Sequence, residues 1–306
     1  MTTGLCFGII TLPNAAWPTM VDRWRYVESL GFDSVWLGDH FVNPHQPSQP
    51  WFEAWTLLTA LATQTTRIRI GPLVTPFALR NPAMLARQAL TLDHISHGRL
   101  ELGLGGGVAT DISYQMVGIP AWDPPERVAR FREVVELIDR MLRNGVTTYA
   151  GRYYQLKEAR MQPPVVQHPR PPITIAANGP AMLKIAAKYA NTWNTYLASP
   201  MSLTEALDVV RQRNILLDEY CSEIGRDAHE IRRSILIWTQ VADTNPFVSV
   251  NAFQELVGRY REVGINEFVF CYPPTEFYQP VGSEQADVFE RIASEVIPAL
   301  RAVPPC

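Results

Sequence analysis

Hydrophobic positions along the chain follow two alternating spacings. Short runs of Val, Ile, Leu and aromatic residues are typical of buried strands. Each is followed by a stretch in which apolar residues recur every three or four positions, as in a helix packed on one face. The segment 54–104 shows this best, because it contains helix, strand, helix and strand with Gly, Pro or Asn near the junctions. Strands that alternate with helices predict a parallel sheet.

The same alternation extends through the whole chain. Strands are predicted at 5–10, 34–38, 67–74, 99–104, 173–177, 192–196, 234–241 and 267–271. Helices are predicted at 19–30, 54–63, 82–97, 126–143, 181–189, 203–222, 252–263 and 284–300. Eight strand–helix units without a break in composition predict an α/β fold, a (β/α)8 TIM barrel, with residues 1–306 as a single domain.

Two long segments interrupt the alternation. Residues 105–125 form a Gly- and Pro-bearing connection after the fourth strand, and residues 145–172 contain a hairpin signal at 149–154 before a proline-rich stretch. Long loops in a compact domain usually bind or cover a ligand, so we expect lid segments here. The alternative is a pair of plain surface insertions.

Composition narrows the function classes. The 306 residues are 47% hydrophobic and carry a net charge of −3, which supports a large core and gives no basic surface for nucleic acid or an anionic membrane. The four cysteines show no metal-site or redox spacing, and we see no targeting or membrane-spanning segment. We therefore expect a cytoplasmic protein with free thiols.

Asp39 and His40 are the first candidate chemical groups. They follow the second predicted strand, and side chains at that end of a barrel strand face the active-site mouth. A carboxylate next to an imidazole is suited to acid–base catalysis, although the pair could equally hold a loop in place. His45 lies nearby, but its spacing from this pair matches no known ligand pattern, so we expect no metal.

The glycine-rich run at 103–107 is the second candidate. It fails as a dinucleotide fingerprint, because Val108 occupies the sixth position and no helix is predicted to begin there. We expect these glycines to let a flat ring or a phosphate approach the backbone.

The third candidate is the turn at Asn178–Gly179, between the fifth strand and the helix opened by Pro180. Free N–H groups and the helix dipole at such a turn favour a phosphate. The alternative is an ordinary Asn-Gly turn.

Taken in order, these motifs resemble the bacterial luciferase-like superfamily, in particular the branch that uses the deazaflavin coenzyme F420. The resemblance covers nearly the full length of the chain. It rests on the stretches 31–36, 39–40, 67–76, 81–83, 92–99, 103–107, 151–154 and 178–194.

The resemblance implies a barrel that holds a flavin or deazaflavin at its carboxyl end, with Asp39 and His40 beside the reactive ring. Val74 and Thr75 would line the ring at a bulge, where the family often has a cis peptide; here it would join Leu73 to Val74. The other cofactor contacts that it implies are Gly107, Asp111, Ala177, Asn178, Gly179 and Ala181, the last three at the phosphate.

This resemblance predicts an oxidoreductase that transfers hydride between reduced F420 and a small apolar or aromatic substrate. His40 would be the acid–base group, oriented by Asp39. Val108 stands where the sugar-phosphate dehydrogenases of the family carry a glutamate, so a phosphorylated sugar is not expected. Aromatic residues that could pack the substrate are Trp51, Phe52, Phe77, Tyr114, Trp122 and Phe277.

Other functions stay open. The nearest is an FMN-dependent monooxygenase of the same fold, which would use reduced flavin and O₂ and a separate cofactor reductase. A metal-assisted hydrolase built on Asp39, His40 and His45, or a binding protein without catalysis, are more distant alternatives. Relatives often dimerise, so the resemblance also implies a homodimer.

Overall fold

A parallel sheet curled into a nearly closed barrel forms the centre of the computed structural model, which describes residues 4–197, 201–238, 245–271 and 283–302. The strands of the barrel are β1 (Cys6–Thr11), β2 (Ser34–Leu37), β3 (Arg69–Pro72), β4 (Thr75–Pro76), β5 (Leu102–Gly105), β8 (Ile173–Ala176), β9 (Thr192–Tyr196), β10 (Arg232–Ile237) and β11 (Glu267–Cys271). Their order in the sheet is β3-β2-β1-β11-β10-β9-β8-β5-β4. The predicted TIM-barrel fold is confirmed.

The third strand of the barrel is divided in two. β3 pairs with β2, whereas β4 pairs with β5, and a bridge between Ile70 and Leu100 joins the two edges of the sheet. The break falls at Leu73–Val74, whose peptide bond is cis, as the family resemblance implied. The strand predicted at 67–74 is therefore observed only as β3, and a second short strand, β4, follows the cis bond. Together β3 and β4 fill one of the eight positions of the barrel.

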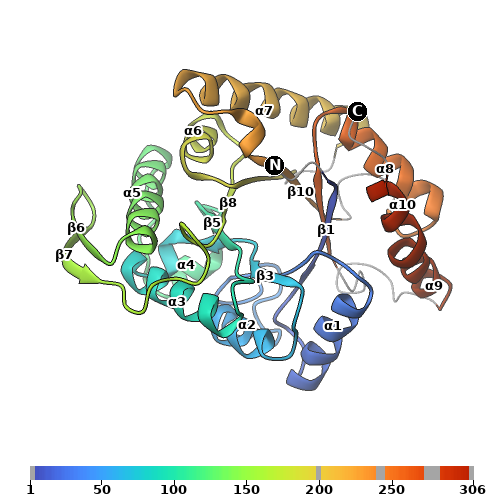
Figure 1. Cartoon of the computed structure of the whole chain (residues 1–306), viewed down its shortest axis with the longest axis horizontal. Helices are drawn as coiled ribbons and strands as arrows, with labels where there is room; N and C mark the ends of the chain where they lie inside the picture. The colour runs from blue at the N-terminus through green and yellow to red at the C-terminus, as the bar shows by residue number, and fades with distance from the viewer. Residues whose placement is uncertain (1–3, 198–200, 239–244, 272–282, 303–306) are drawn as a thin grey trace.

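Helices surround the barrel (Figure 1). They are α1 (Trp17–Ser29), α2 (Ala54–Ala62), α3 (Pro82–Ile95), α5 (Pro124–Arg143), α6 (Pro180–Tyr189), α7 (Leu203–Glu223), α8 (Val250–Glu262) and α9 (Ser283–Arg291). A π-helical turn at Ile292–Val296 joins α9 to α10 (Ile297–Ala302), and a short helix, α4 (Ile112–Met116), interrupts the long connection after β5. Within the described residues, no helix is long and apolar enough to cross a membrane.

Local sequence signals explain where these helices begin. Asn81 precedes α3 and accepts the N–H group of Ala83 at 3.0 Å, and Pro82 occupies the first helical position.

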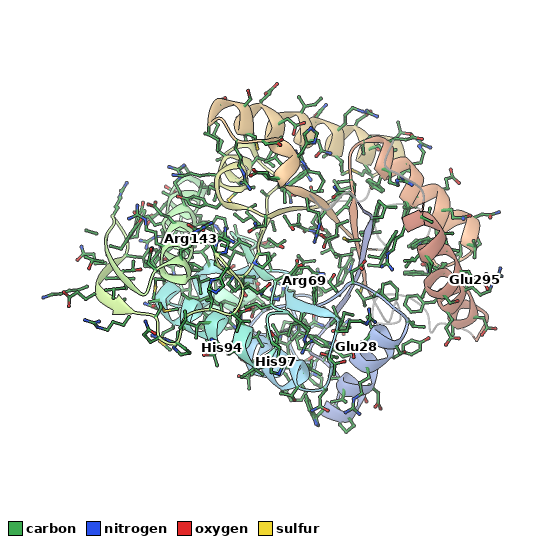
Figure 2. All side chains as sticks on the ribbon, viewed as in Figure 1. Glu28, Arg69, His94, His97, Arg143 and Glu295 are labelled. Carbon is green, nitrogen blue, oxygen red and sulfur yellow. The ribbon has the colours of Figure 1, made fainter. Side chains whose placement is uncertain are left out.

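Glu28, near the end of α1, accepts the N–H groups of Arg67 and Ile68, which fixes the entry to β3. Figure 2 labels Glu28 beside α1 and Arg69 nearer the centre of the barrel.

The core has two parts, because successive residues of a strand face opposite sides of the sheet. Outward-facing residues such as Phe7 and Phe268 pack against the helices in the larger cluster. A smaller group, here called the inner apolar cluster, fills the barrel below its carboxyl ends: Ile10, Trp36, Leu73, Val269 and Cys271, with Val74, Leu236 and Trp238 packed against it.

Both long insertions are attached to α5. The second contains the predicted hairpin, formed by β6 (Val146–Ala150) and β7 (Gln155–Arg160). Glu133 of α5 accepts the N–H group of Tyr153 beyond β6. Arg130 of α5 lies over the rings of Trp122 and Tyr153, at 4.6 and 4.2 Å from their centres. The parts of the insertions that touch α5 are therefore structural anchors.

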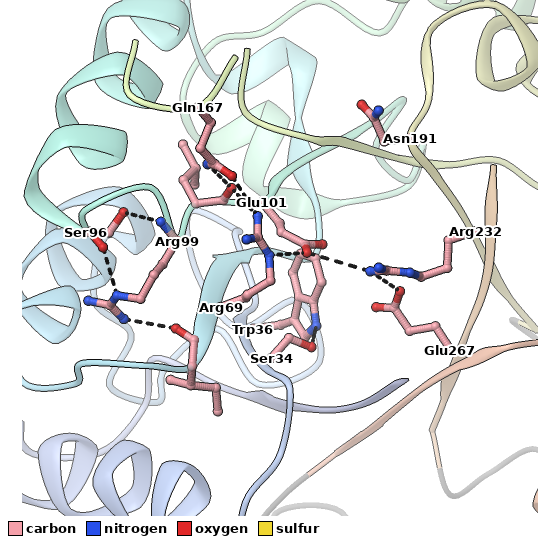
Figure 3. A network of polar contacts seen from close by, with 12 residues as sticks. Ser34, Trp36, Arg69, Ser96, Arg99, Glu101, Gln167, Asn191, Arg232 and Glu267 are labelled. Carbon is pink, nitrogen blue, oxygen red and sulfur yellow. Dashed lines mark hydrogen bonds and ion pairs between the residues drawn. The ribbon is translucent and has the colours of Figure 1, made fainter. Parts of the chain in front are cut away.

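Charged side chains occupy the floor of the barrel, where the strands begin (Figure 3). Arg69 donates to Glu101, and Arg232 lies 3.3 Å from Glu267 and 3.8 Å from Glu101. Burial, together with the nearby charge of Glu101, raises the pKa of Glu267 to about 7, although Arg232 opposes this. Residues at this end of a TIM barrel serve stability, because catalysis takes place at the opposite end.

We predict that Glu267→Gln changes the pH dependence of stability. Because the pKa of Glu267 is raised in the folded state, its contribution to stability is full below about pH 4.5 and is lost as the pH rises through about 7. The Gln variant cannot ionise. Relative to the wild type, the free energy of unfolding of the variant should therefore increase as the pH rises between these two values, by up to about 3 kcal/mol. This follows because a tenfold change in proton affinity corresponds to about 1.4 kcal/mol.

Urea unfolding across this pH range measures the difference. The exposed Glu255→Gln serves as the control and should show no such trend. A constant difference between the wild type and Glu267→Gln would contradict the prediction.

Candidate active site

The predicted site residues lie at the carboxyl end of the barrel. Asp39 and His40 follow β2, Thr75 begins β4, Asp111 lies in the connection after β5, and Asn178 follows β8. Because parallel strands end at the same edge, these segments meet around one mouth, which is where TIM barrels carry their chemistry.

Asp39 is held in a buried ion pair. Its side chain is almost fully buried, and Arg80 donates to both carboxylate oxygens, at 2.6 Å to Oδ2 and 3.0 Å to Oδ1. The hydroxyl of Thr75 donates to Oδ2 at 2.9 Å. Burial raises the pKa of Asp39, and Arg80 and Thr75 partly offset this by favouring the charged form.

The same ion pair connects several elements. Arg80 also contacts Glu53, which accepts the N–H group of Thr56 at 2.7 Å and so caps α2. The indole of Trp55 donates to the Thr75 hydroxyl at 2.9 Å. The Thr75 hydroxyl thus donates and accepts a hydrogen bond within the protein, and its side chain is buried. Arg80 therefore ties the end of β2 to β4 and α2.

His40 pairs with a different carboxylate from the one predicted. Its Nδ1 lies 2.6 Å from Oδ2 of Asp111, which is buried and caps α4 by accepting the N–H group of Ser113 at 2.8 Å. The prediction that Asp39 orients His40 is wrong, because both oxygens of Asp39 are taken by Arg80 and Thr75.

The backbone of His40 is also fixed. The indole of Trp51 donates to its carbonyl oxygen at 2.8 Å. The imidazole itself is 28% exposed at the mouth. Burial by itself raises the pKa of Asp111, but the hydrogen bonds from His40 and Ser113 outweigh it and lower the pKa, so this carboxylate is ionised at neutral pH.

The glycine run makes room for neighbouring parts of the protein itself. A Cβ atom on Gly103 would lie 1.9 Å from the carbonyl oxygen of Pro72, and one on Gly105 would lie 2.5 Å from the Val74 side chain. Gly107 has a φ of +67° and packs against the hydroxyl of Tyr114. These glycines therefore accommodate the break between β3 and β4, and the expectation that they admit a ring or phosphate is not supported at these three positions.

The turn after β8 keeps free backbone donors. The N–H and carbonyl groups of Ala177 are both used, by Asn194 and by the Trp193 indole. Gly179 precedes α6 without a capping side chain, and a Cβ atom built on it would meet nothing within 4 Å. Neither Gly179 nor Ala181 donates its N–H group to another described residue. The turn therefore has open space and unused donors.

A cation lies beside this turn. Arg213 of α7 donates to the side-chain oxygens of Asn178 at 3.1 Å and Thr195 at 2.7 Å. Burial lowers its pKa, and its contacts among the described residues are with neutral groups. Its charge is therefore available to an anion at the turn.

The predicted aromatic residues have different surroundings. Phe77 is buried and stacks on Trp122 with ring centres 5.6 Å apart, so these two anchor the loop. Tyr114 is also buried, whereas Phe52 is exposed, and Phe277 lies outside the described residues. The sequence interpretation missed Phe41, which follows His40 and is 54% exposed.

Two of the other histidines lie away from the mouth of the barrel. His94 Nε2 lies 2.7 Å from the carbonyl oxygen of Pro164, and Figure 2 labels His94 and His97 outside the ring of strands. Within the described ranges, no three His, Cys, Asp or Glu side chains gather closely enough to hold a metal ion.

Sequence reasoning missed Arg80 and Arg213. Arg80 directly precedes the Asn81–Pro82 helix start, and the capping motif explains that helix start without any role for Arg80. Arg213 lies within a long helix. Neither position has a local signal that separates it from a solvent-exposed arginine.

Comparison with known proteins identifies the family. The family model described as luciferase-like monooxygenase matches residues 6–280, so the chain belongs to this family. A solved structure of an F420-dependent secondary alcohol dehydrogenase, in complex with an F420–acetone adduct, has a similar fold. Its TM-score is 0.79 at 21% identity, over 97% of this chain and 99% of that one.

Two curated relatives are similar in sequence. The F420-dependent glucose-6-phosphate dehydrogenase of Kineococcus radiotolerans is 36% identical over 171 residues, 53% of this chain and 47% of the relative. The 5,10-methylenetetrahydromethanopterin reductase of Archaeoglobus fulgidus is 32% identical over 185 residues, 60% of this chain and 50% of the relative. The matched regions thus span about half the length of these relatives.

We predict that Arg80→Gln destabilises the protein by about 3 kcal/mol, because removing one partner of a buried ion pair leaves the other charge uncompensated. The double variant Asp39→Asn, Arg80→Gln should recover part of this loss. Denaturant unfolding measures both. Arg211→Gln, which breaks an exposed pair with Asp208, is the control and should cost at most about 1 kcal/mol. Equal unfolding free energies for Arg80→Gln and the wild type would refute the role given to this pair.

Proposed function

We propose that this protein is an oxidoreductase that transfers hydride between coenzyme F420 and a small organic substrate at the carboxyl end of its barrel. The observation that carries the proposal is that three features meet around this end. The open turn at Gly179 and the His40 imidazole lie at the mouth, directly above the inner apolar cluster, in a chain of the luciferase-like family. Curated relatives named as F420-dependent enzymes support the choice of cofactor.

The turn after β8 fits the phosphate of such a cofactor. The N–H groups of Gly179 and Ala181 are unused among the described residues, the helix dipole of α6 favours an anion, and Arg213 supplies a positive charge. Ala177, which the family resemblance also implied, would contribute shape only, because its backbone groups are bonded to β9 residues.

The ring of the cofactor would be held by the inner apolar cluster, where Leu73 and Val74 interrupt the third strand of the barrel. Asp39 would sit beside it as a carboxylate neutralised by Arg80. Gly107 and Asp111 would shape the opposite wall through the Tyr114 contact and the bond to His40.

A bound deazaflavin supplies a hydride donor or acceptor. The chain contributes position, exclusion of water and a proton. His40 holds or releases that proton at Nε2, since Nδ1 is engaged by Asp111. Exposed apolar side chains close to His40 in the sequence or after the glycine run, Phe41, Phe52 and Val108, support a small apolar or aromatic substrate.

A homodimer and a cytoplasmic location are the finer parts of this proposal. The homodimer is supported by the family resemblance alone, and the location by the composition of the sequence. Sedimentation of the purified chain tests the dimer.

Titration with F420 and with FMN, each oxidised and reduced, tests the cofactor. We predict micromolar binding of F420, and we predict that Gly179→Val weakens it about 10–100-fold, because the added side chain fills the space left for the phosphate. Gly258→Val, at another glycine with open space around it, is the control and should leave binding unchanged.

The outcomes separate two functions. Tight binding of reduced FMN alone would favour an FMN-dependent monooxygenase, which would require O₂ and a separate cofactor reductase. The family description names a monooxygenase. Binding of neither cofactor would overturn the proposal. If Gly179→Val binds F420 as tightly as the wild type does, the phosphate does not bind at this turn.

A further inference from the structure

We infer that Asp111 is the positioning residue of His40. By accepting a hydrogen bond from Nδ1, it fixes which nitrogen of the neutral imidazole carries the proton. The inference rests on the proposed function, because it concerns the acid–base group of that reaction. Its basis is the 2.6 Å contact between Nδ1 of His40 and Oδ2 of Asp111, two residues that lie 71 positions apart in the sequence.

The geometry leaves Asp111 little freedom. Its side chain is 1% exposed, and its other oxygen accepts the N–H group of Ser113 at 2.8 Å. The backbone of His40 is held by Trp51, which donates to its carbonyl oxygen. Carboxylate and imidazole are therefore both fixed before any ligand binds, which is the condition for an effective acid–base group.

The chemistry of the pair follows from hydrogen-bond donation. An ionised carboxylate only accepts, so Nδ1 must carry a proton, and the neutral imidazole presents the lone pair of Nε2. When Nε2 gains a proton, the negative charge of Asp111 faces the imidazolium. His40 can thus take a proton from a substrate at Nε2 or return one there.

The hydride and the proton are both accounted for in each direction of the reaction. In the reducing direction, hydride from the reduced cofactor adds to a substrate carbon, and a π bond of the substrate breaks. His40 gives its Nε2 proton to the atom that receives the electron pair of that bond, and the cofactor is left oxidised. In the oxidising direction, His40 would accept that proton while the hydride passes from the carbon to the oxidised cofactor and the π bond of the substrate re-forms.

Asp111 also has a structural role, because it caps α4. The test must separate the two roles, and Asp111→Asn does so, since Asn is as good an N-cap as Asp but carries no negative charge. Asp123 provides a matched control. It caps α5 by accepting the N–H group of Glu126 at 2.8 Å, and Asp123→Asn makes the same substitution at the same kind of position.

The first experiment reads the imidazole directly. Nitrogen NMR of the protein labelled at histidine, assigned with His40→Ala, should show the neutral ring of His40 protonated at Nδ1. Asp111→Asn should shift part of the population to Nε2 protonation, and Asp123→Asn should not. A wild-type ring protonated at Nε2, or an unchanged spectrum in Asp111→Asn, would overturn the inference. This test needs no cofactor, so it stands apart from failure of the proposed function.

The second experiment measures turnover with whichever cofactor binds. Asp111→Asn should lower kcat about 100-fold, within the range of a positioned acid or base, while the Kd of the cofactor stays within about threefold. In the His40→Ala background, Asp111→Asn should lower kcat no further, because Asp111 acts through His40. An equal loss in both backgrounds, or the same loss in Asp123→Asn, would contradict the positioning role.

Discussion

The buried ion pair between Asp39 and Arg80 holds the mouth of the barrel together. Two charges removed from water are tolerated only when they are paired and hydrogen-bonded, and here Thr75 and Glu53 complete that requirement. The pair joins the ends of β2 and β4 to the start of α2, and His40 follows Asp39 directly in the chain. The position of the imidazole therefore depends on an interaction in which it takes no part.

Charge is divided between the two ends of the barrel. At the floor, the buried carboxylates of Glu101 and Glu267 form a network with the partly exposed Arg69 and Arg232 that serves the fold. Between floor and mouth lies the inner apolar cluster. At the mouth the carboxylates of Asp39 and Asp111 each have a partner, whereas the Gly179 turn and Arg213 keep unused donors and charge. An anionic group and a flat ring would find complementary surfaces at these two places.

The alternation of strands and helices predicted the barrel and its strands, because periodicity is a local property. The break at Leu73–Val74 followed from the family resemblance and not from periodicity, which favoured one strand at 67–74. The partner of His40 could not be predicted, since Asp39 is adjacent in sequence while Asp111 is brought close only by α4 and the long connection after β5. The role of Gly103 and Gly105 could not be predicted for a similar reason, because the atoms that fill their space, the Pro72 carbonyl and the Val74 side chain, come from the divided third strand.

A crystal structure of the protein with F420 tests the proposed cofactor site most directly. We expect the phosphate to bind the N–H groups of Gly179 and Ala181 beside Arg213, and the ring to lie on Leu73 and Val74. Nε2 of His40 should face the substrate side, while the bond from Nδ1 to Asp111 is kept. A cofactor bound away from the Gly179 turn, or a His40 ring that has left Asp111, would contradict it.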